Sequence, residues 1–225
     1  MTDDSEPIWL RPERAATGRP AERSRAEITA AAVAVADRGG LGEVSMRNVA
    51  LELGTGAASL YRYVAGRDDL LDLMTDATAV EYRLEAPTGN AVRDLLALAE
   101  QTRSIMLRHR WLPQLVLTRP VLGPRAIAVL DHVLDILAEH PLDERTKLEV
   151  FALLNATVAT FALNELAAAD RPEHAVAYLG HVAAGGERPR VTALYEALAA
   201  SDGDPADRRV AALTAIVTGL LGDRT

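Results

Sequence analysis

Residues 45–71 read SMRNVALELGTGAASLYRYVAGRDDLL and hold the most informative pattern in the chain. Ser45 is a good N-cap, and the apolar residues that follow it recur at helical spacing. Gly54 ends this first helix after little more than two turns. Thr55 can cap a second short helix that reaches about Val64. The stretch therefore predicts two short helices joined by a tight turn that contains glycine, which is the helix-turn-helix arrangement.

The second of these helices has the surface that the major groove of B-DNA requires. The groove admits one helix and little else, so a helix that enters it must be short and must carry small or polar residues outward. Residues 56–59, Gly-Ala-Ala-Ser, meet this demand. Tyr61, Arg62 and Tyr63 follow, and their hydroxyls and charge can reach phosphates. These three side chains cannot all face a core, so the pattern favours a DNA-binding module over a helical hairpin inside a bundle.

The flanking segments complete a small helical domain. Residues 24–27, Ser-Arg-Ala-Glu, form a capping box, which predicts a helix that begins there and ends at residues 38–40, Arg-Gly-Gly. The two aspartates at residues 68–69 favour the first turn of a fourth helix that runs to about Arg83. Residues 1–20 contain three prolines and a glycine and predict a mobile arm.

The rest of the chain has the pattern of a helical bundle, because no segment alternates like a strand and aromatic residues are only 4%. Further helices are expected at about residues 91–109, 111–117, 124–140, 143–169, 173–184, 191–200 and 205–222. We therefore predict an all-α fold in three parts. They are a mobile N-terminal arm at residues 1–20, a three-helix helix-turn-helix DNA-binding domain at 21–67, and a larger helical domain at 68–225.

Charge is distributed unevenly along the chain. The net charge of −8 argues against nucleic acid when the chain is taken as a whole. Residues 11–67, however, hold nine arginines against six acidic residues, a local excess of +3. A positive segment on an acidic protein is typical of a small polyanion-binding module joined to a larger body, although ordinary variation in surface charge gives the same excess.

The composition excludes several kinds of site and of protein. The chain has no cysteine, which removes disulfides, thiolate zinc sites, iron–sulfur clusters and cysteine nucleophiles. The acidic N-terminus is not followed by the apolar segment of a signal peptide. No apolar run approaches the roughly 20 residues that a membrane span needs. We therefore expect a soluble, cytoplasmic protein with no membrane partner.

No pattern in the sequence predicts catalysis. A glycine-rich phosphate loop and a G-x-S-x-G elbow are both absent from the sequence. His174 and His181 could share a helix face, but no carboxylate at matching spacing completes a metal site with them. Surface histidines are the simpler interpretation. We expect no catalytic residue, no metal and no cofactor, and an enzyme is not the favoured class.

Residues 55–71, TGAASLYRYVAGRDDLL, resemble the recognition-helix signature of TetR-family transcriptional repressors. Residues 45–54 match the first half of the same motif. The resemblance is specific from residue 24 to about residue 71 and then fades, although the length and the helical pattern suit the C-terminal domain of the family. The junction at residues 109–113, His-Arg-Trp-Leu-Pro, is similar to the tetracycline-repressor-like subgroup. The resemblance implies that residues 68–225 form a ligand-binding and dimerisation domain.

The resemblance also implies roles at the DNA interface. Arg47 matches a position that reads a guanine in some relatives, and a phosphate contact is the alternative. Met46 departs from the family, since relatives often have a threonine there that bonds phosphate. Residues 19–20, Arg-Pro, suggest an arm that lies along the DNA. The remaining expected contacts are small side chains at base edges and polar or charged ones at the phosphates: Ala57 and Ser59 for the bases, and Tyr61, Arg62, Tyr63 and Arg67 for the backbone.

The favoured function is a homodimeric repressor that binds a pseudo-palindromic operator and is released by an apolar or amphipathic small molecule. The resemblance implies that binding shifts the fourth helix and changes the spacing of the two recognition helices. The pocket is expected among the helices at about residues 91–109, 124–140 and 143–169. Core packing is the alternative for its aromatic members. The candidate lining residues are Gln101, Ile105, Trp111, Gln114, Phe151, Asn155 and Phe161.

Two apolar helices, at about residues 151–166 and 210–221, combine large and small side chains and are expected to form the dimer interface. Polar residues among the apolar ones, such as Asn155 and Asn164, would set its register. Two other interpretations stay open. One is a DNA-binding regulator of the same fold that answers to a protein partner or to no ligand. The other is an all-helical enzyme or ligand carrier whose helix-turn-helix is incidental.

Overall fold

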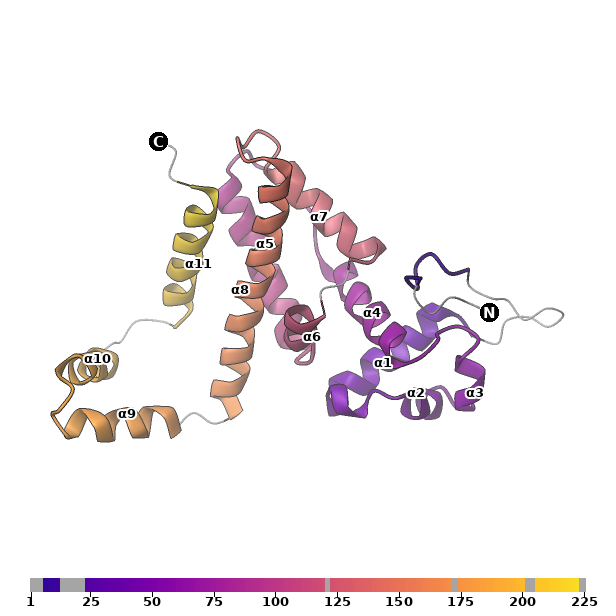
Figure 1. Cartoon of the computed structure of the whole chain (residues 1–225), viewed down its shortest axis with the longest axis horizontal. Helices are drawn as coiled ribbons and strands as arrows, with labels where there is room; N and C mark the ends of the chain where they lie inside the picture. Colours follow the sequence, from indigo (N-terminus) through magenta and orange to yellow (C-terminus); the bar gives the residue numbers. More distant parts are fainter. Residues whose placement is uncertain (1–5, 13–22, 120–121, 171–173, 201–204, 223–225) are drawn as a thin grey trace. The chain divides into compact units, whose positions relative to one another are not determined.

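The computed structural model describes residues 6–12, 23–119, 122–170, 174–200 and 205–222. Over these residues the chain forms helices and no strands, which confirms the all-α prediction (Figure 1). Two short 3-10 turns, labelled η, interrupt the series. In chain order the elements are α1 Arg25–Gly39, η1 Leu41–Glu43, α2 Met46–Glu52, α3 Ala57–Leu60, α4 Arg67–Thr78, η2 Ala79–Glu81, α5 Ala91–Arg108, α6 Leu112–Thr118, α7 Pro124–Ile136, α8 Glu144–Asp170, α9 His174–Ala184, α10 Pro189–Ala199 and α11 Pro205–Leu221.

Local capping signals place the first helices where the sequence predicts them. The Ser24 hydroxyl accepts a hydrogen bond from the backbone N–H of Glu27, and the Glu27 carboxylate accepts one from the backbone N–H of Ser24, so the capping box of α1 is complete. The Ser45 hydroxyl caps α2 in the same way. Gly40 and Gly54 follow α1 and α2 at φ of 77° and 64°. Glycine adopts these angles without the steric cost that other residues meet, which is why both helices end there.

α3 is shorter than predicted. It ends at Leu60 rather than near Val64, and the following residues continue as tight turns in which the N–H groups of Tyr63 and Val64 both donate to the Leu60 carbonyl. This path turns the side chains of Tyr63 and Val64 into the domain core, where both are buried. The burial of these two residues replaces a regular last turn of helix.

α4 also ends early, at Thr78 rather than near Arg83. The turn η2 follows it, and the backbone of Tyr82 is then extended. The Tyr82 hydroxyl donates to the hydroxyl of Thr102 on α5, at 2.9 Å. A contact with a helix far along the chain therefore stabilises the break, and no local sequence signal predicts it.

The expectation of a mobile arm does not hold for residues 6–12. Ile8 is buried, and the Arg25 guanidinium of α1 donates to the carbonyl oxygens of Ile8 and Arg11, at 3.2 and 2.7 Å. Arg11 also forms an ion pair with Asp69 of α4. This segment is therefore bound to the domain that contains α1 and α4. The rest of the predicted arm, with Arg19 and Pro20, lies outside the described residues.

The chain forms two compact units, residues 1–162 and residues 163–225. In the first unit α1 packs on α2 and α4, and α2 packs on α3. α4 also packs on α6 and α7, and α5 packs on α7. In the second unit α9 packs on α10. A Cβ at Gly180 of α9 would lie only 3.0 Å from the hydroxyl oxygen of Tyr195 on α10, so this glycine permits the close approach.

α8 is apolar over most of its length. Among the described residues it is the one helix that is long and apolar enough to cross a membrane, over Glu144–Ala168. The expectation that no apolar run approaches this length is therefore wrong. Only 28% of its most apolar window is buried within the chain. The same length and composition suit a helix that packs against a second subunit, so they are weak evidence for a membrane span.

Candidate DNA interface and ligand cavity

The inner face of the helix-turn-helix is apolar and closed. Val49 and Ala50 of α2, Leu60 of α3 and Val64 are all buried. Their packing holds α3 against α2, as the contact between these helices shows. The outer side of α3 therefore presents its residues in a fixed direction, which a helix that reads a DNA groove requires.

The outer face offers charge and small side chains. Arg47 and Arg62 are exposed, and within the described part of the chain neither guanidinium makes a hydrogen bond or an ion pair. Tyr61 is 57% exposed. Gly56 and Ala58 are exposed as well, and residues of this size let a helix come close to base edges. The helix-turn-helix thus exposes one phenol, small residues at the start of α3, and two cations that have no partner among the described residues.

Ala57 and Ser59 are half-buried at the same helix. The Ser59 hydroxyl donates to the carbonyl of Gly56 at 2.7 Å and lies 3.0 Å from the hydroxyl of Thr55. Because its donor is already used, Ser59 can meet a base edge only as an acceptor, through water, or after giving up the bond to Gly56.

Tyr63 and Arg67 are placed differently from the phosphate contacts that the resemblance implies. Tyr63 is only 4% exposed and belongs to the core of the domain. The Arg67 guanidinium donates to the carbonyl oxygens of Val44 and Leu41, at 2.9 and 2.8 Å. It thereby joins the start of α4 to the connection between α1 and α2. In this structure both residues hold the domain together.

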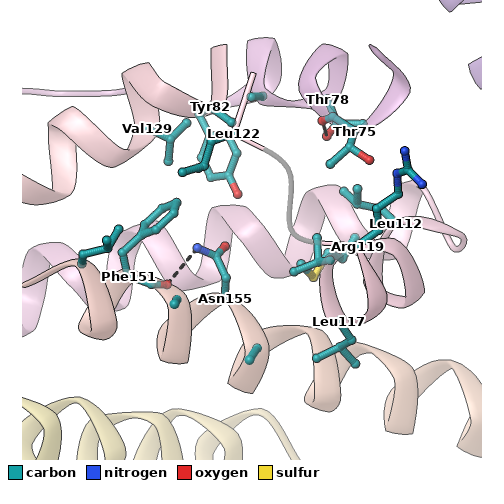
Figure 2. Close-up of a pocket in the computed structure, with 17 residues that line it drawn as sticks. Thr75, Thr78, Tyr82, Leu112, Leu117, Arg119, Leu122, Val129, Phe151 and Asn155 are labelled. Carbon is teal, nitrogen blue, oxygen red and sulfur yellow. Dashed lines mark hydrogen bonds between the residues drawn. The ribbon is translucent and has the colours of Figure 1, made fainter. Parts of the chain in front are cut away.

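A cavity of about 370 Å³ lies in the first unit among α4, α5, α6, α7 and α8 (Figure 2). Its wall is mostly apolar. Five polar or charged side chains also line it: Thr75, Thr78, Tyr82, Arg119 and Asn155. An apolar wall with a few polar groups is typical of sites that bind small molecules.

The polar groups are spread along this cavity. Figure 2 shows Arg119 and Phe151 on opposite sides of the view, with Asn155 and Tyr82 between them. The Asn155 side-chain amide donates to the carbonyl of Phe151, one turn earlier in α8, at 2.9 Å. Its oxygen Oδ1 has no hydrogen-bond partner among the described residues, so it can accept a bond from a ligand. Arg119 can only donate.

Two of the predicted ligand-binding residues, Phe151 and Asn155, line this cavity. The other five do not. Ile105 is buried in the interior, and Gln101 exchanges two hydrogen bonds with the backbone of Arg83, at 2.8 and 3.2 Å. Gln114 lines a separate polar hollow beside Arg67. Phe161 lies further along α8 and is half-buried there.

Trp111, the fifth, belongs to a polar cluster that joins three segments of the first unit. Its indole Nε1 donates to the Asp37 carboxylate of α1 at 2.6 Å. The His109 ring nitrogens lie 2.8 Å from Asp37 and 2.7 Å from the Glu81 carboxylate of η2. Arg108, at the end of α5, also pairs with Glu81. The cluster therefore ties α1 to η2 and to the end of α5.

The two carboxylates change the acid–base behaviour of this cluster. Burial alone would lower the pKa of His109, but the hydrogen bonds and charges of Asp37 and Glu81 outweigh it and raise the pKa above the ordinary 6.5. Burial would raise the pKa of Glu81, but hydrogen bonds and charges from Arg108 and His109 outweigh it and hold the pKa below 4.5. The cluster therefore favours the protonated form of His109 and the ionised form of Glu81.

Three aspartates on α4 connect this helix to three other segments. Asp69 pairs with Arg11 and accepts from the backbone N–H of Ala65 at 2.6 Å. Asp72 accepts from Arg119, at the end of α6, at 2.5 Å. Asp76 is buried and accepts from the two backbone N–H groups of residues 125 and 126, at the start of α7, each at 2.9 Å. α4 is thus bound to the N-terminal segment, to α6 and to α7.

Most of the cavity wall escaped the sequence analysis, including Thr75, Tyr82 and Arg119. No motif marks these residues, because they come from separate segments of the chain and meet only in the folded structure.

Comparison with known families identifies both parts of the chain. Residues 28–74 match the family described as bacterial regulatory proteins, tetR family. Residues 85–222 match the tetracyclin repressor-like C-terminal domain. The chain belongs to the TetR family. The family and the C-terminal subgroup inferred from the helix-turn-helix residues and the junction at residues 109–113 are thereby confirmed.

Two bacterial regulators are similar to this TetR-family chain over part of their length. The HTH-type transcriptional repressor DrrR1 of Streptomyces coeruleorubidus is 34% identical over 167 residues, which are 71% of this chain and 60% of that protein. An HTH-type transcriptional regulator of Saccharopolyspora erythraea is 39% identical over 132 residues, 58% of this chain and 56% of that protein. The matched stretch thus spans less than two thirds of each relative.

Solved structures of the family share the fold over most of the chain. Apo ActR of Streptomyces coelicolor is 28% identical, with a TM-score of 0.77, and the match covers 88% of this chain and 95% of ActR. ActR in complex with actinorhodin is 27% identical, with a TM-score of 0.75 over 89% of this chain and 96% of ActR. A similar TetR-family fold thus holds a small molecule in ActR.

Proposed function

We propose that this protein is a cytoplasmic, homodimeric repressor that binds a pseudo-palindromic DNA operator and releases it when a small amphipathic molecule enters the cavity. The observation that carries the proposal is the position of α4. Its start is joined by Arg67 to the connection before α2, whereas Thr75 and Thr78 near its end line the cavity. One helix thus joins the helix-turn-helix domain to the cavity.

The coupling needs only a difference in ligand affinity between two positions of α4. A ligand that prefers the position that does not fit DNA shifts the population toward it, and a few kcal/mol of preference suffice. The complex of ActR with actinorhodin and the name of DrrR1 as a repressor support this assignment by similarity. A regulator rather than an enzyme is also favoured because the relatives and the matched family are named as transcriptional or regulatory proteins.

The surface of α8 supports a dimer. Leu153 is 50% exposed, and Thr160 and Asn164 are exposed on the same side of the helix at helical spacing. On α11, Val210 is 50% exposed. An apolar helix face that carries a few polar residues is typical of a subunit interface, where the polar groups define the register.

A gel-shift assay with the DNA upstream of the protein's own gene tests the DNA-binding half of the proposal. We expect a discrete complex that is weakened in Arg62→Ala, because this exposed cation is available to phosphates. A screen of small molecules for release of that DNA tests the ligand half. A complex that no small molecule releases would favour control by a protein partner. If the protein binds no DNA, the alternative of a ligand carrier with an incidental helix-turn-helix is favoured.

A further inference from the structure

Arg119 has an unusual setting at the cavity. Among the described residues that line the cavity, it is the only charged one. It follows the last turn of α6, and its side chain is 33% exposed. Figure 2 shows its guanidinium at the side of the cavity where Thr75 lies. A cation next to an apolar wall attracts anions more strongly than one in open solvent, because the surrounding dielectric constant is lower.

The same guanidinium is bound to α4. Its Nε donates to the Asp72 carboxylate at 2.5 Å, and its Nη1 lies 3.3 Å from the Asp68 carboxylate. Asp68 is largely exposed, so this second pair contributes little, whereas Asp72 is shielded and forms the main tie. A guanidinium carries five N–H donors. Asp72 takes the Nε donor, Nη1 faces the Asp68 carboxylate, and Nη2 donates to the Asp68 carbonyl oxygen at 3.4 Å, so two N–H groups remain. Arg119 therefore has donors left for a ligand while it is held on α4.

We propose that the cavity selects an amphipathic molecule with an anionic oxygen, such as a carboxylate or a sulfonate, and that this anion competes with Asp72 for Arg119. The proposal rests on the proposed function, because it takes this cavity as the inducer site. It adds the chemical class of the inducer and the residue that reads its charge. The apolar body of the molecule would lie toward Phe151, on the other side of the cavity (Figure 2).

Through this competition, the charge of the ligand determines whether the bond between Arg119 and Asp72 of α4 is kept. A neutral ligand leaves the bond between Arg119 and Asp72 in place. An anion draws the guanidinium toward the cavity, because charge-assisted bonds from arginine to an anionic oxygen are short and strong. Loss of the Asp72 bond loosens α4 from α6, and a loosened α4 changes the balance between the two conformations of the repressor.

Two fluorescent dyes that differ in one charge test the proposal. Anilinonaphthalene sulfonate is anionic, and phenylnaphthylamine is the same molecule without its sulfonate. Their dissociation constants are measured by titration against the full chain. We expect the anionic dye to bind more tightly than the neutral one, and we expect Arg119→Gln to reduce this preference about tenfold without weakening the neutral dye. Arg119→Lys, which keeps the charge, should retain part of the preference.

Asp72→Asn provides an effect in the opposite direction. It removes the competing carboxylate, so the anionic dye should bind several-fold more tightly while the neutral dye is unchanged. A residue that only holds the fold together would weaken both dyes in either variant. Arg125→Gln is the matched control, since Arg125 pairs with Asp76 on the neighbouring helix and does not line the cavity. It should leave the ratio of the two affinities unchanged.

The proposal is wrong if Arg119→Gln prefers the anionic dye over the neutral dye as strongly as the unchanged chain does. It is also wrong if Asp72→Asn binds the anionic dye more weakly than the unchanged chain. If neither dye binds, the cavity does not accept apolar molecules of this size, and the inference is lost together with the ligand half of the proposed function. Because no DNA is present in the titrations, a failed gel-shift assay and a failed dye experiment remain distinguishable.

Discussion

Residues a few positions apart in the helix-turn-helix have different tasks. Tyr61 projects from the domain, whereas Tyr63 is buried in it. Arg62 is exposed and unpaired among the described residues, whereas Arg67 is bonded to two backbone carbonyls. Exposure and hydrogen bonding thus separate the side chains that can meet DNA from those that stabilise the domain. Arg47 belongs to the first group, and its role can be tested against that of Tyr61.

Arg47→Ala should weaken operator binding and flatten the preference at one base pair in each half-site. An arginine that bonds the O6 and N7 atoms of guanine provides about 1–3 kcal/mol of discrimination between bases. Tyr61→Phe should weaken binding to all sequences alike, because the target of its hydroxyl is a phosphate, which is the same in every sequence. The measurement is the affinity for the operator and for its single-base variants at one fixed salt concentration.

The control for this pair is Tyr63→Phe, which removes a hydroxyl from a residue that belongs to the core and should leave DNA affinity nearly unchanged. If Arg47→Ala lowers every affinity by one common factor, Arg47 is a phosphate anchor and the assignment to a guanine is wrong.

Among the elements, α4 and the cluster around His109 make the connections between distant segments. The aspartates of α4 bind the N-terminal segment, α6 and α7. His109 links α1 to η2 through two carboxylates. Both sets of bonds join the helices of the DNA-binding part to the helices around the cavity. The His109 set includes two groups whose pKa is shifted, since the pKa of His109 is raised and that of Glu81 is lowered.

The contribution of His109 to stability should fall as the pH rises. Its pKa in the folded chain is raised, so the stabilisation is fully present below the unfolded pKa of about 6.5 and is lost as the pH rises through the folded value. His109→Gln, which stays neutral, should cost on the order of 2 kcal/mol at about pH 6 and much less at about pH 9. The measurement is urea unfolding of both chains over this pH range.

Glu81 determines how the stabilisation by the same cluster changes at acid pH. Because its pKa is lowered, its contribution is present above about 4.5 and is lost as the pH falls through the folded value. In Glu81→Gln, which cannot be protonated at this position, we therefore expect the free energy of unfolding to fall less as the pH drops below about 4.5. A free-energy difference between the unchanged chain and His109→Gln that does not vary with pH would show that His109 is held by hydrogen bonds alone.

For the whole molecule, the exposed apolar residues of α8 and α11 are the surface on which the proposed dimer depends. The double variant with Leu153→Glu and Val210→Glu should convert a dimer into monomers, because two charges in each subunit would have to be buried in the interface. Sedimentation velocity or light scattering measures the mass. Leu198→Glu on α10 changes a leucine that is equally exposed, and it should leave the dimer intact. A dimer that survives the double variant places the interface on another surface.

Helix positions, the helix-turn-helix and the TetR family could be predicted from the sequence because their signals are local. The capping box at Ser24, the N-cap at Ser45 and the glycines after α1 and α2 act within a few residues of the chain. Apolar residues at helical spacing predict a helix wherever the rest of the chain lies. The residues around α3 could be matched to a family for the same reason, since they form one continuous motif.

The cavity, the burial of Tyr63 and the partners of Arg67, Trp111 and Arg119 depended on tertiary structure. Arg119 bonds Asp72 from 47 positions away, and Trp111 bonds Asp37 from 74 positions away. Whether an arginine meets a phosphate, a carbonyl or a carboxylate depends on which groups the packing of other helices brings within reach. Local spacing carries no information about these groups, because helix packing is determined by apolar contacts spread over the whole chain.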